Sequence, residues 1–537
     1  MRRIGLMILS AATLALPTSC MKDEVEIDEV SYKRPLNIAA PISVISADYN
    51  NILDRLAKSD SEKTPEIKID DNGMLYVEYN KDYIIDWTNV LALNTVGFSL
   101  NLPMPLNTDA KISRTITERI KLNSDDSQRI DSLTISAATM TVKAEPMDAS
   151  GKITMSIPEL YNNGEPFVIN WQPASGCDQI IDLTGYNIEP KHSIDSSYLT
   201  INISIDGTAT SSSLNSTFGF SVSMSEIEPE IVYGFFGTRQ VYNSPSVMAL
   251  DFFDSYEFSD GIEFTGTDIT MDVDNWTGTQ FDVTMDLMRL VDRDSASSNI
   301  NFSIENTLYV DQVSHENYRP DGNFKPCSNN FKLDTTNSDV NSLLSIDPIS
   351  YKYRILVKSN PLGETKENFL TKETSLNCHI NMHIPIWMRV DNVDRSDTID
   401  FDLNSIIIDK DNADYVDTLG MYFEFANGFP VSMLAQAYLT DDDMHIVDSL
   451  FPKYELLWLL PKFDKNYRIS EWGHTSKKAI MDKEKIKRCS DADVKYILLK
   501  TIASTDLDSP NLYFKFYEEY GMKMNFSFEV ISNYLSN

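Results

Sequence analysis

Seven residues, Leu199-Thr200-Ile201-Asn202-Ile203-Ser204-Ile205, alternate apolar and polar side chains along their whole length. Successive side chains of a β-strand point to opposite faces, so this period of two predicts a strand with one buried face and one wet face. Residues 218–224 and 522–530 alternate in the same way. Clean alternation is typical of antiparallel sheets. We therefore expect an all-β fold made of antiparallel β-sandwich-like domains with a few short helices.

Local signals add turns and helices to this frame. Residues 67–77 predict a hairpin, because Asn72-Gly73 favours a tight turn between two apolar runs. Asp206-Gly207 predicts the turn that ends the strand at 199–205. Apolar side chains at Tyr49, Ile52, Leu53 and Leu56 have helical spacing, and short helices are also expected at 339–344 and within 480–488.

The chain has 537 residues and a net charge of -34, from 46 Lys and Arg against 80 Asp and Glu. The length suggests about two to four domains at roughly 150 residues each. A hydrophobic content of 42% excludes a disordered chain, and the acidic balance argues against a nucleic-acid partner. A charged break at Glu226–Glu230 and a polar stretch at 319–330 predict β-rich domains at 35–225, 226–325 and 326–537. The sequence has no repeat of fixed period, so neither a propeller nor a solenoid is expected.

The N-terminus has the form of an export signal. Arg2 and Arg3 precede the apolar run Ile4–Leu16, and the small residues before Cys20 follow. Thirteen residues span only about 20 Å as a helix, which is too short to cross a membrane. Residues 17–20 resemble the lipobox of bacterial lipoproteins, which implies removal of the signal peptide 1–19 and acylation of Cys20. Pro17 departs from the usual Leu, Val or Ile, so an ordinary secretory signal is the alternative.

The residues after Cys20 form an acidic tether over 20–34. Lys22, Asp23 and Glu24 resemble the export signal that places lipoproteins of Bacteroidota on the outer face of the outer membrane. The resemblance implies lipid anchoring in the outer membrane, facing the cell exterior, and two or three acyl chains on one residue give stable anchoring. No other stretch reaches eighteen apolar residues, so no transmembrane helix is expected.

Five further segments together carry a resemblance to a known family: Ile231–Arg239, Leu250–Asp254, Asp260–Phe264, His383–Trp387 and Glu424–Val431. They resemble large uncharacterised surface lipoproteins of Bacteroidota, over most of the chain from about residue 35. The shared features are turn glycines, prolines at strand ends and apolar strands. The resemblance implies a β-rich architecture and a surface location, and it supplies no catalytic residue.

The four cysteines beyond the signal region, Cys177, Cys327, Cys378 and Cys489, are widely scattered. No CxxC pair exists, so neither a zinc ribbon nor a thioredoxin-like motif is available. Four cysteines allow three disulfide pairings, and the sequence favours none of them. Buried free thiols are an equally good interpretation.

Motifs for catalysis and metal binding are largely missing. The sequence has no HExxH, GxSxG, Walker A or GxGxxG pattern. Cys378, His379 and His383 resemble a metal cluster, but the two histidines would lie about 13 Å apart on a strand, too far to share a metal. Asp409, Asp411 and Asp414 are weak candidates for the ligands of a calcium ion. Solvated turns explain them better, so no cofactor is expected.

Large aromatic residues are the remaining candidates for ligand contact. Trp87, Trp171 and Trp276 could stack on sugars, although such side chains more often fill cores. The favoured hypothesis is a non-enzymatic, lipid-anchored surface protein with a binding or envelope-structural role. The alternatives are a carbohydrate-binding lipoprotein beside an outer-membrane transporter, a surface hydrolase, and a carrier of an apolar ligand. The expected partner is the outer membrane, and a protein or glycan partner is left open.

Overall fold

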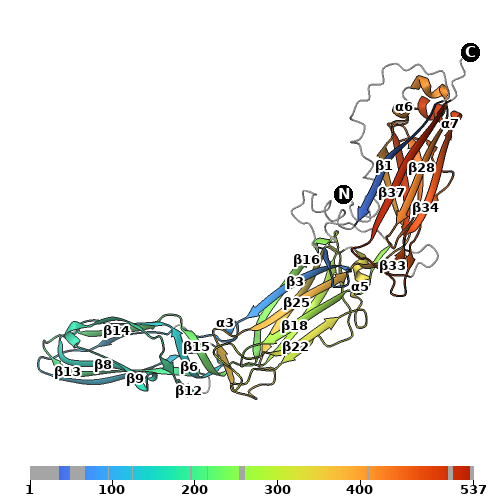
Figure 1. Ribbon diagram of the computed structural model, residues 1–537. Coiled ribbons are helices and arrows are strands. Elements are labelled where there is room, and N and C mark those ends of the chain that lie inside the picture. Colours follow the sequence, from blue (N-terminus) through green and yellow to red (C-terminus); the bar gives the residue numbers. More distant parts are fainter. Residues whose placement is uncertain are drawn as a thin grey trace, which may run out of the picture.

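The structure is a computed structural model, and it describes residues 36–48, 67–94, 96–123, 125–193, 196–214, 216–252, 261–346, 348–407, 410–505 and 512–532. The sheets are antiparallel and the helices are few and short, which confirms the predicted all-β class. The strands form three lobes that follow one another in a row (Figure 1).

The first lobe packs a four-stranded sheet, ordered β10-β7-β14-β4, against part of a nine-stranded sheet, ordered β12-β13-β8-β11-β6-β15-β24 with β5 on β13 and β9 on β8. Its elements are β4 (Gly97–Pro103), β5 (Lys111–Lys121), β6 (Arg129–Ala137), β7 (Thr139–Ala144), β8 (Ala149–Asn162), β9 (Glu165–Trp171), η1 (Pro173–Ser175), β10 (Cys177–Asp182), β11 (Asn187–Ile188), β12 (Lys191–Ser193), β13 (Ser196–Ala209), β14 (Thr217–Met224) and β15 (Glu228–Phe235).

The second lobe holds two five-stranded sheets, β16-β23-β19-β20 with β21 on β19, and β2-β3-β25-β18-β22, together with the three-stranded sheet β17-β26-β36. Its elements are β2 (Ile67–Ile69), β3 (Leu75–Ile85), α3 (Trp87–Val90), β16 (Arg239–Ala249), β17 (Ile262–Phe264), β18 (Asp268–Asn275), β19 (Phe281–Val291), β20 (Ser297–Asn299), β21 (Thr307–Val310), β22 (Cys327–Leu333), α5 (Val340–Leu343), η2 (Leu344–Ile346), β23 (Ser350–Ser359), β24 (Asn368–Thr371), β25 (Leu376–Pro385), β26 (Trp387–Val390) and β36 (Phe514–Lys515).

The third lobe contains the sheets β1-β37-β28-β34 and β27-β35-β29-β30 with β31 on β29, and the small pair β32-β33. Its elements are β1 (Leu36–Asp48), β27 (Val393–Asp400), α6 (Leu403–Ile406), η3 (Lys410–Tyr415), β28 (Val416–Asn427), β29 (Ser432–Thr440), β30 (Ile446–Ser449), β31 (Glu455–Trp458), β32 (Lys462–Phe463), β33 (Ile469–Glu471), β34 (Gly473–Asp482), α7 (Lys483–Asp491), β35 (Tyr496–Ser504) and β37 (Gly521–Ser532).

Alternation in the sequence becomes alternation in burial. In β13, Ile201, Ile203 and Ile205 are at most 1% exposed, whereas Ser204 between them faces solvent. Full burial of each isoleucine contributes about 1.5–3 kcal/mol. The inward faces of the paired sheets therefore form the apolar core that runs through the lobes.

The predicted turn at Asp206-Gly207 is wrong, because β13 continues through both residues to Ala209. Gly207 lies directly opposite Gly151 of β8. A Cβ atom on Gly207 would lie 2.2 Å from the Ser150 carbonyl oxygen, so glycine is needed here for close strand approach. The Asp206-Gly207 pair therefore marks a position where the backbones of two paired strands lie very close together, and not a reversal of the chain.

The other local predictions have mixed outcomes. The hairpin at 67–77 is confirmed, with β2 and β3 paired across the Asn72-Gly73 turn. The short helices at 339–344 and 480–488 appear as α5 and α7, the second beginning only after β34 ends at Asp482. The Asp482 carboxylate accepts a hydrogen bond from the backbone N–H of Lys485 and so caps α7. The predicted helix at Tyr49–Leu56 lies outside the described residues.

Strand pairing crosses the domain boundaries that the sequence suggested at 225 and 325. β1 pairs along its length with β37, and β3 pairs with β25. The second and third lobes are therefore each assembled from segments far apart in the sequence. Residues 96–235 alone supply nearly all of the first lobe, with β24 added at the end of its longer sheet.

The first and second lobes share strands and a buried polar contact. β15 pairs with β6 on one side and with β24 on the other. The amide of Gln128, only 3% exposed, donates to the carbonyl oxygens of Val90 at 2.9 Å and Phe236 at 3.2 Å. Arg239 donates to the same Val90 oxygen at 2.8 Å. This network fixes α3 against the base of the first lobe.

The second and third lobes are joined by the segment after residue 512. Leu75 donates its backbone N–H to Phe516, and Phe516 in turn donates to Ile386. β36 pairs with β26, and Met74 and Tyr517 form a further bridge. These bonds fix the segment on the second lobe. The junction itself is crossed where the backbone N–H of Thr505, just after β35, donates to the Val390 carbonyl oxygen at 2.8 Å, and where Phe463 of β32 stacks on Phe514. The three lobes form one elongated body (Figure 1).

Candidate functional site

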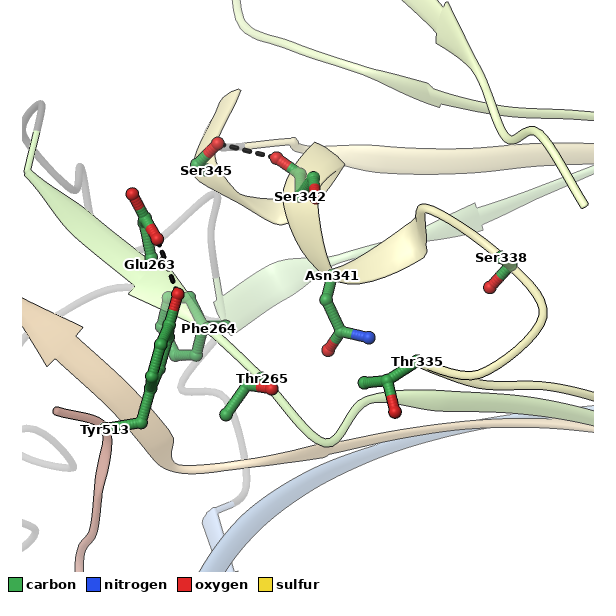
Figure 2. A pocket seen from close by; sticks show the side chains of 9 residues that line it. All are labelled: Glu263, Phe264, Thr265, Thr335, Ser338, Asn341, Ser342, Ser345 and Tyr513. Atoms are coloured by element: carbon green, nitrogen blue, oxygen red, sulfur yellow. Dashed lines mark hydrogen bonds between the residues drawn. The ribbon is translucent and has the colours of Figure 1, made fainter. Parts of the chain in front are cut away.

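A polar pocket of about 350 Å³ opens in the second lobe, next to the junction with the third. Figure 2 shows side chains from β17, from the loop before α5, from α5 and η2, and from the segment before β36 turned toward it. Its lining consists of Glu263, Phe264, Thr265, Thr335, Ser338, Asn341, Ser342, Ser345 and Tyr513.

Glu263 ties the two sides of this pocket together. Its carboxylate accepts a hydrogen bond from the Tyr513 hydroxyl at 2.6 Å and from the Arg389 guanidinium at 2.5 Å. The guanidinium carbon lies 5.7 Å from the centre of the Tyr513 ring. Burial, and then the hydrogen bond to Glu263, raises the pKa of Tyr513. The Glu263 side chain is still 40% exposed, so part of its accepting capacity faces the pocket.

Asn341 in α5 presents a donor to the pocket. Its Oδ1 accepts the backbone N–H of Thr267 at 2.9 Å, which fixes the orientation of the amide, because only oxygen can accept there. The Nδ2 atom is then directed away from Thr267 and is buried with no hydrogen-bond partner. In Figure 2 the amide lies between Thr265 and Thr335.

Two local features position these side chains. Gly266, with φ of +78°, turns the chain between β17 and β18, and a Cβ atom there would lie 2.7 Å from the Trp387 ring. On the other side, the Asp334 carboxylate accepts the backbone N–H of Thr336 at 2.8 Å, and the Ser338 hydroxyl donates to the Asp334 carbonyl oxygen. These bonds shape the loop that carries Thr335.

The pocket lining combines hydroxyl groups, one amide and one carboxylate, and it has no histidine, cysteine or lysine. General acid–base or nucleophilic chemistry needs a base within hydrogen-bond reach of a nucleophile, or two carboxyl groups at a suitable separation. This lining offers hydrogen bonds in both directions instead. Its chemistry therefore suits recognition of a polar molecule.

An aromatic cluster lies near the other end of the second lobe, where the segment after β21 packs on β24. Its members are Tyr233, Trp276, His315, Tyr318, Phe324 and Phe369. The Tyr233 hydroxyl lies 2.8 Å from His315 Nε2, and the rings meet mostly edge to face. Edge-to-face packing around the buried Phe369 holds this segment on the sheet and does not build a flat platform.

The three tryptophans considered for sugar stacking occupy packing positions. Trp171 is 9% exposed and stacks on Phe220 with ring centres 6.3 Å apart. Trp87 is half-buried against the core, and Trp276 packs edge to face on Phe324. None of the three lines the polar pocket.

The Cys378, His379 and His383 side chains do not converge. All three lie on β25, where the buried thiol points into the core and its pKa is raised by burial to about 12. His379 Nδ1 lies 2.7 Å from an Asp82 carboxylate oxygen, while the His383 ring packs against Tyr76. Strand geometry thus separates the two histidines, as the sequence spacing indicated.

The weak calcium candidates are only partly described. Asp409 and the side chain of Asp411 lie outside the described residues. The Asp414 carboxylate is exposed and lies 2.7 Å from Lys487 Nζ, whose hydrogen bond and charge lower the pKa of Asp414. Across the ranges that the structure describes, no three His, Cys, Asp or Glu side chains are grouped so as to hold a metal ion.

Lipidation at Cys20 and the export signal after it stay predictions, because Cys20, Lys22, Asp23 and Glu24 lie outside the described residues. No described helix is long and apolar enough to span a bilayer. The thiols of Cys177, Cys327, Cys378 and Cys489 are not joined in disulfides, and the last two are buried.

The pocket residues were not anticipated from the sequence. They come from three stretches, near residues 264, 340 and 513, and most are serines and threonines in a chain where such residues are common. The unpaired Asn341 amide becomes visible only once Thr267 lies beside it. Local patterns carry no trace of that contact.

No protein-family model matches the chain, and neither does any curated protein. Among solved structures, it is similar to a protein of Parabacteroides distasonis described as secreted, with a TM-score of 0.31 and 13% identity over 55% of this chain and 82% of that one. That organism belongs to the Bacteroidota. The structure of infectious bursal disease virus Gx strain gives a TM-score of 0.13 and 10% identity over 88% and 82%. Similarities this slight carry no argument about function.

Proposed function

We propose that this chain is a lipid-anchored protein of the outer membrane, facing the cell exterior, with a non-catalytic binding and structural role. The observation that carries the structural part is the joining of three lobes into one body, by strand pairing and buried polar contacts between the first two and by backbone and ring contacts between the last two. The export-type N-terminus with Cys20, followed by Lys22-Asp23-Glu24, supports the anchor. The hydroxyl-rich pocket with its single carboxylate supports binding over catalysis.

With an anchor at Cys20, the register of the third lobe supports an orientation in which one end of this lobe faces the membrane. Leu36, the first residue of β1, lies opposite Ser532, and Ser532 lies opposite Val416 near the start of β28. This is also the end where β34 passes into α7, remote from the second lobe (Figure 1). The fifteen residues between Cys20 and Leu36 reach about 50 Å at most. The third lobe is then nearest the membrane and the first lobe is farthest from it.

Labelling with a radioactive fatty acid tests the anchor. We expect incorporation into the wild type and none into Cys20→Ala. Equal incorporation into both proteins would contradict lipidation at this residue. Protease treatment of intact cells, before and after replacement of Lys22-Asp23-Glu24, tests the export signal. Protection of the wild type on intact cells would contradict the outward-facing position.

Inserted protease sites test the orientation. One site is placed in the loop 210–214 of the first lobe, and a matched site follows α7 after Asp491. We expect faster cleavage on intact cells at the first-lobe site, because the other lies close to the membrane. Equal rates on intact cells, with both sites cut equally in purified protein, would contradict the orientation and leave the lipid anchor standing.

A further inference from the structure

The unpaired Asn341 amide is the starting point. Its Nδ2 atom is buried and has no partner, and its orientation is fixed through Oδ1 by Thr267. A buried donor without an acceptor costs about 1–3 kcal/mol. An oxygen atom of a bound molecule removes that cost by accepting the hydrogen bond. In the unbound protein a water molecule can accept it, and the bound molecule then displaces this water. An acceptor placed opposite Asn341 would therefore gain a hydrogen bond that the described side chains do not supply.

The opposite wall requires a donor. Glu263 can only accept hydrogen bonds when ionised, and its bonds from Arg389 and Tyr513 leave lone pairs on an exposed carboxylate. Hydroxyl groups of Thr265, Thr335 and Ser342 line the space between and can donate or accept. A molecule that fills this pocket must present donors and acceptors on several sides at once.

Charge and size narrow the class further. Arg389 neutralises Glu263, so the site has little net charge, and the chain as a whole is strongly acidic, which disfavours anions. The polar lining disfavours an apolar ligand. A volume of about 350 Å³ is at the small end of ligand pockets, which range over about 300–1,000 Å³.

We propose that this pocket binds a neutral polyhydroxylated ligand, a mono- or disaccharide unit, through the Asn341 amide and the Glu263 carboxylate. This proposal rests on the binding role given above and names its ligand class. The half-buried Tyr513 ring beside Glu263 adds apolar surface for one face of a sugar ring (Figure 2). The lipid anchor is not needed for this binding.

The test uses the purified full-length protein and a panel of methyl glycosides of glucose, mannose, galactose and N-acetylglucosamine. Saturation-transfer NMR detects contact, and calorimetric titration gives the affinity. We expect at least one neutral glycoside to bind, and glucuronate to bind more weakly because the chain as a whole is strongly acidic. Failure of every neutral glycoside to bind would overturn the inference, while the fatty-acid labelling result would still decide the anchor.

Two variants locate the binding. Asn341→Asp keeps the oxygen that accepts from Thr267 but removes the donor, so we expect about tenfold weaker binding from the loss of one hydrogen bond. Thr335→Val removes an exposed hydroxyl with no change in shape, and it serves if Asn341→Asp does not fold. Thr115→Val, an equivalent change on the first lobe, is the matched control. Binding unchanged in both pocket variants would overturn the assignment to this pocket.

Discussion

Replacing Gln128 with leucine would loosen the junction between the first and second lobes. The side chain keeps nearly the same volume but loses its hydrogen bonds to Val90, Phe236 and Ala92. Arg239 still donates to the Val90 oxygen, so that group keeps a partner. The buried carbonyl of Phe236 loses the bond from this amide, and so does the N–H of Ala92. The variant therefore removes hydrogen bonds of the Gln128 amide while the packed volume stays nearly the same.

The expected loss follows from these contacts. One unpaired buried carbonyl costs about 1–3 kcal/mol, and the lost bond to Val90 adds about 1 kcal/mol. A total of about 2–4 kcal/mol shifts the equilibrium between docked and undocked lobes by roughly 30-fold to 1,000-fold, at about 1.4 kcal/mol per factor of ten. Small-angle X-ray scattering should report a broader range of molecular lengths for Gln128→Leu. Hydrogen exchange should rise at α3 and at the start of β16.

Gln179→Leu makes the same chemical change on the exposed edge strand β10 and is the matched control. It should leave both the scattering profile and the exchange at α3 unchanged. If Gln128→Leu also leaves both unchanged, the buried amide does not hold the junction and the reasoning fails. If both variants broaden the profile equally, the effect comes from the exchange of glutamine for leucine in general and not from the junction.

Two further predictions concern stability. Burial of Glu159 opposes its ionisation, but the hydrogen bonds from Lys191 and from the Thr200 backbone N–H together outweigh this and lower its pKa below the ordinary value of 4.5. The stabilisation is therefore complete above about pH 4.5 and is lost as the pH falls through the folded-state value. Urea titrations should show that Lys191→Met flattens this acid dependence, and an unchanged dependence would contradict it. Gly278→Ala places a Cβ atom 2.1 Å from the Phe369 ring and should lower the free energy of unfolding by about 1–3 kcal/mol. Gly97 has open space around it, so Gly97→Ala should lower the melting temperature little. Equal losses of stability in the two variants would contradict this prediction.

Sequence patterns predict strands well here and strand partners poorly. The alternation at 199–205 and at 522–530 identifies β13 and β37, because burial of one face is a local property. The pairing of β37 with β1 is not local, and neither is the pairing of β3 with β25. Gly207 shows the same limit in one residue, since its role depends on Gly151 across the sheet. Boundaries drawn from composition could not anticipate sheets built from distant segments.

The candidate site was harder to predict than the fold. Histidines and aspartates attract attention because of their chemistry, yet His379 and Asp414 lie in surface ion pairs. The pocket depends on small hydroxyl groups and on an asparagine whose oxygen is already engaged. An asparagine carries no sequence mark of which half of its amide will lack a partner. That information exists only after three distant stretches have folded together.

The position of β1 beside β37 also sets an order of assembly. The 472 residues between Asp48 and Gly521 must be made before these two strands can meet. The first lobe is built almost wholly from one continuous stretch, so it can fold while later residues are still emerging. The third lobe is completed only by its last strand, β37, which lies between β1 and β28. Until β37 is present, β1 has no partner strand in this sheet and one edge of β28 is left unpaired. A chain truncated shortly before residue 521 would thus lose the pairing that completes the third lobe, while the first lobe would keep all of its strands.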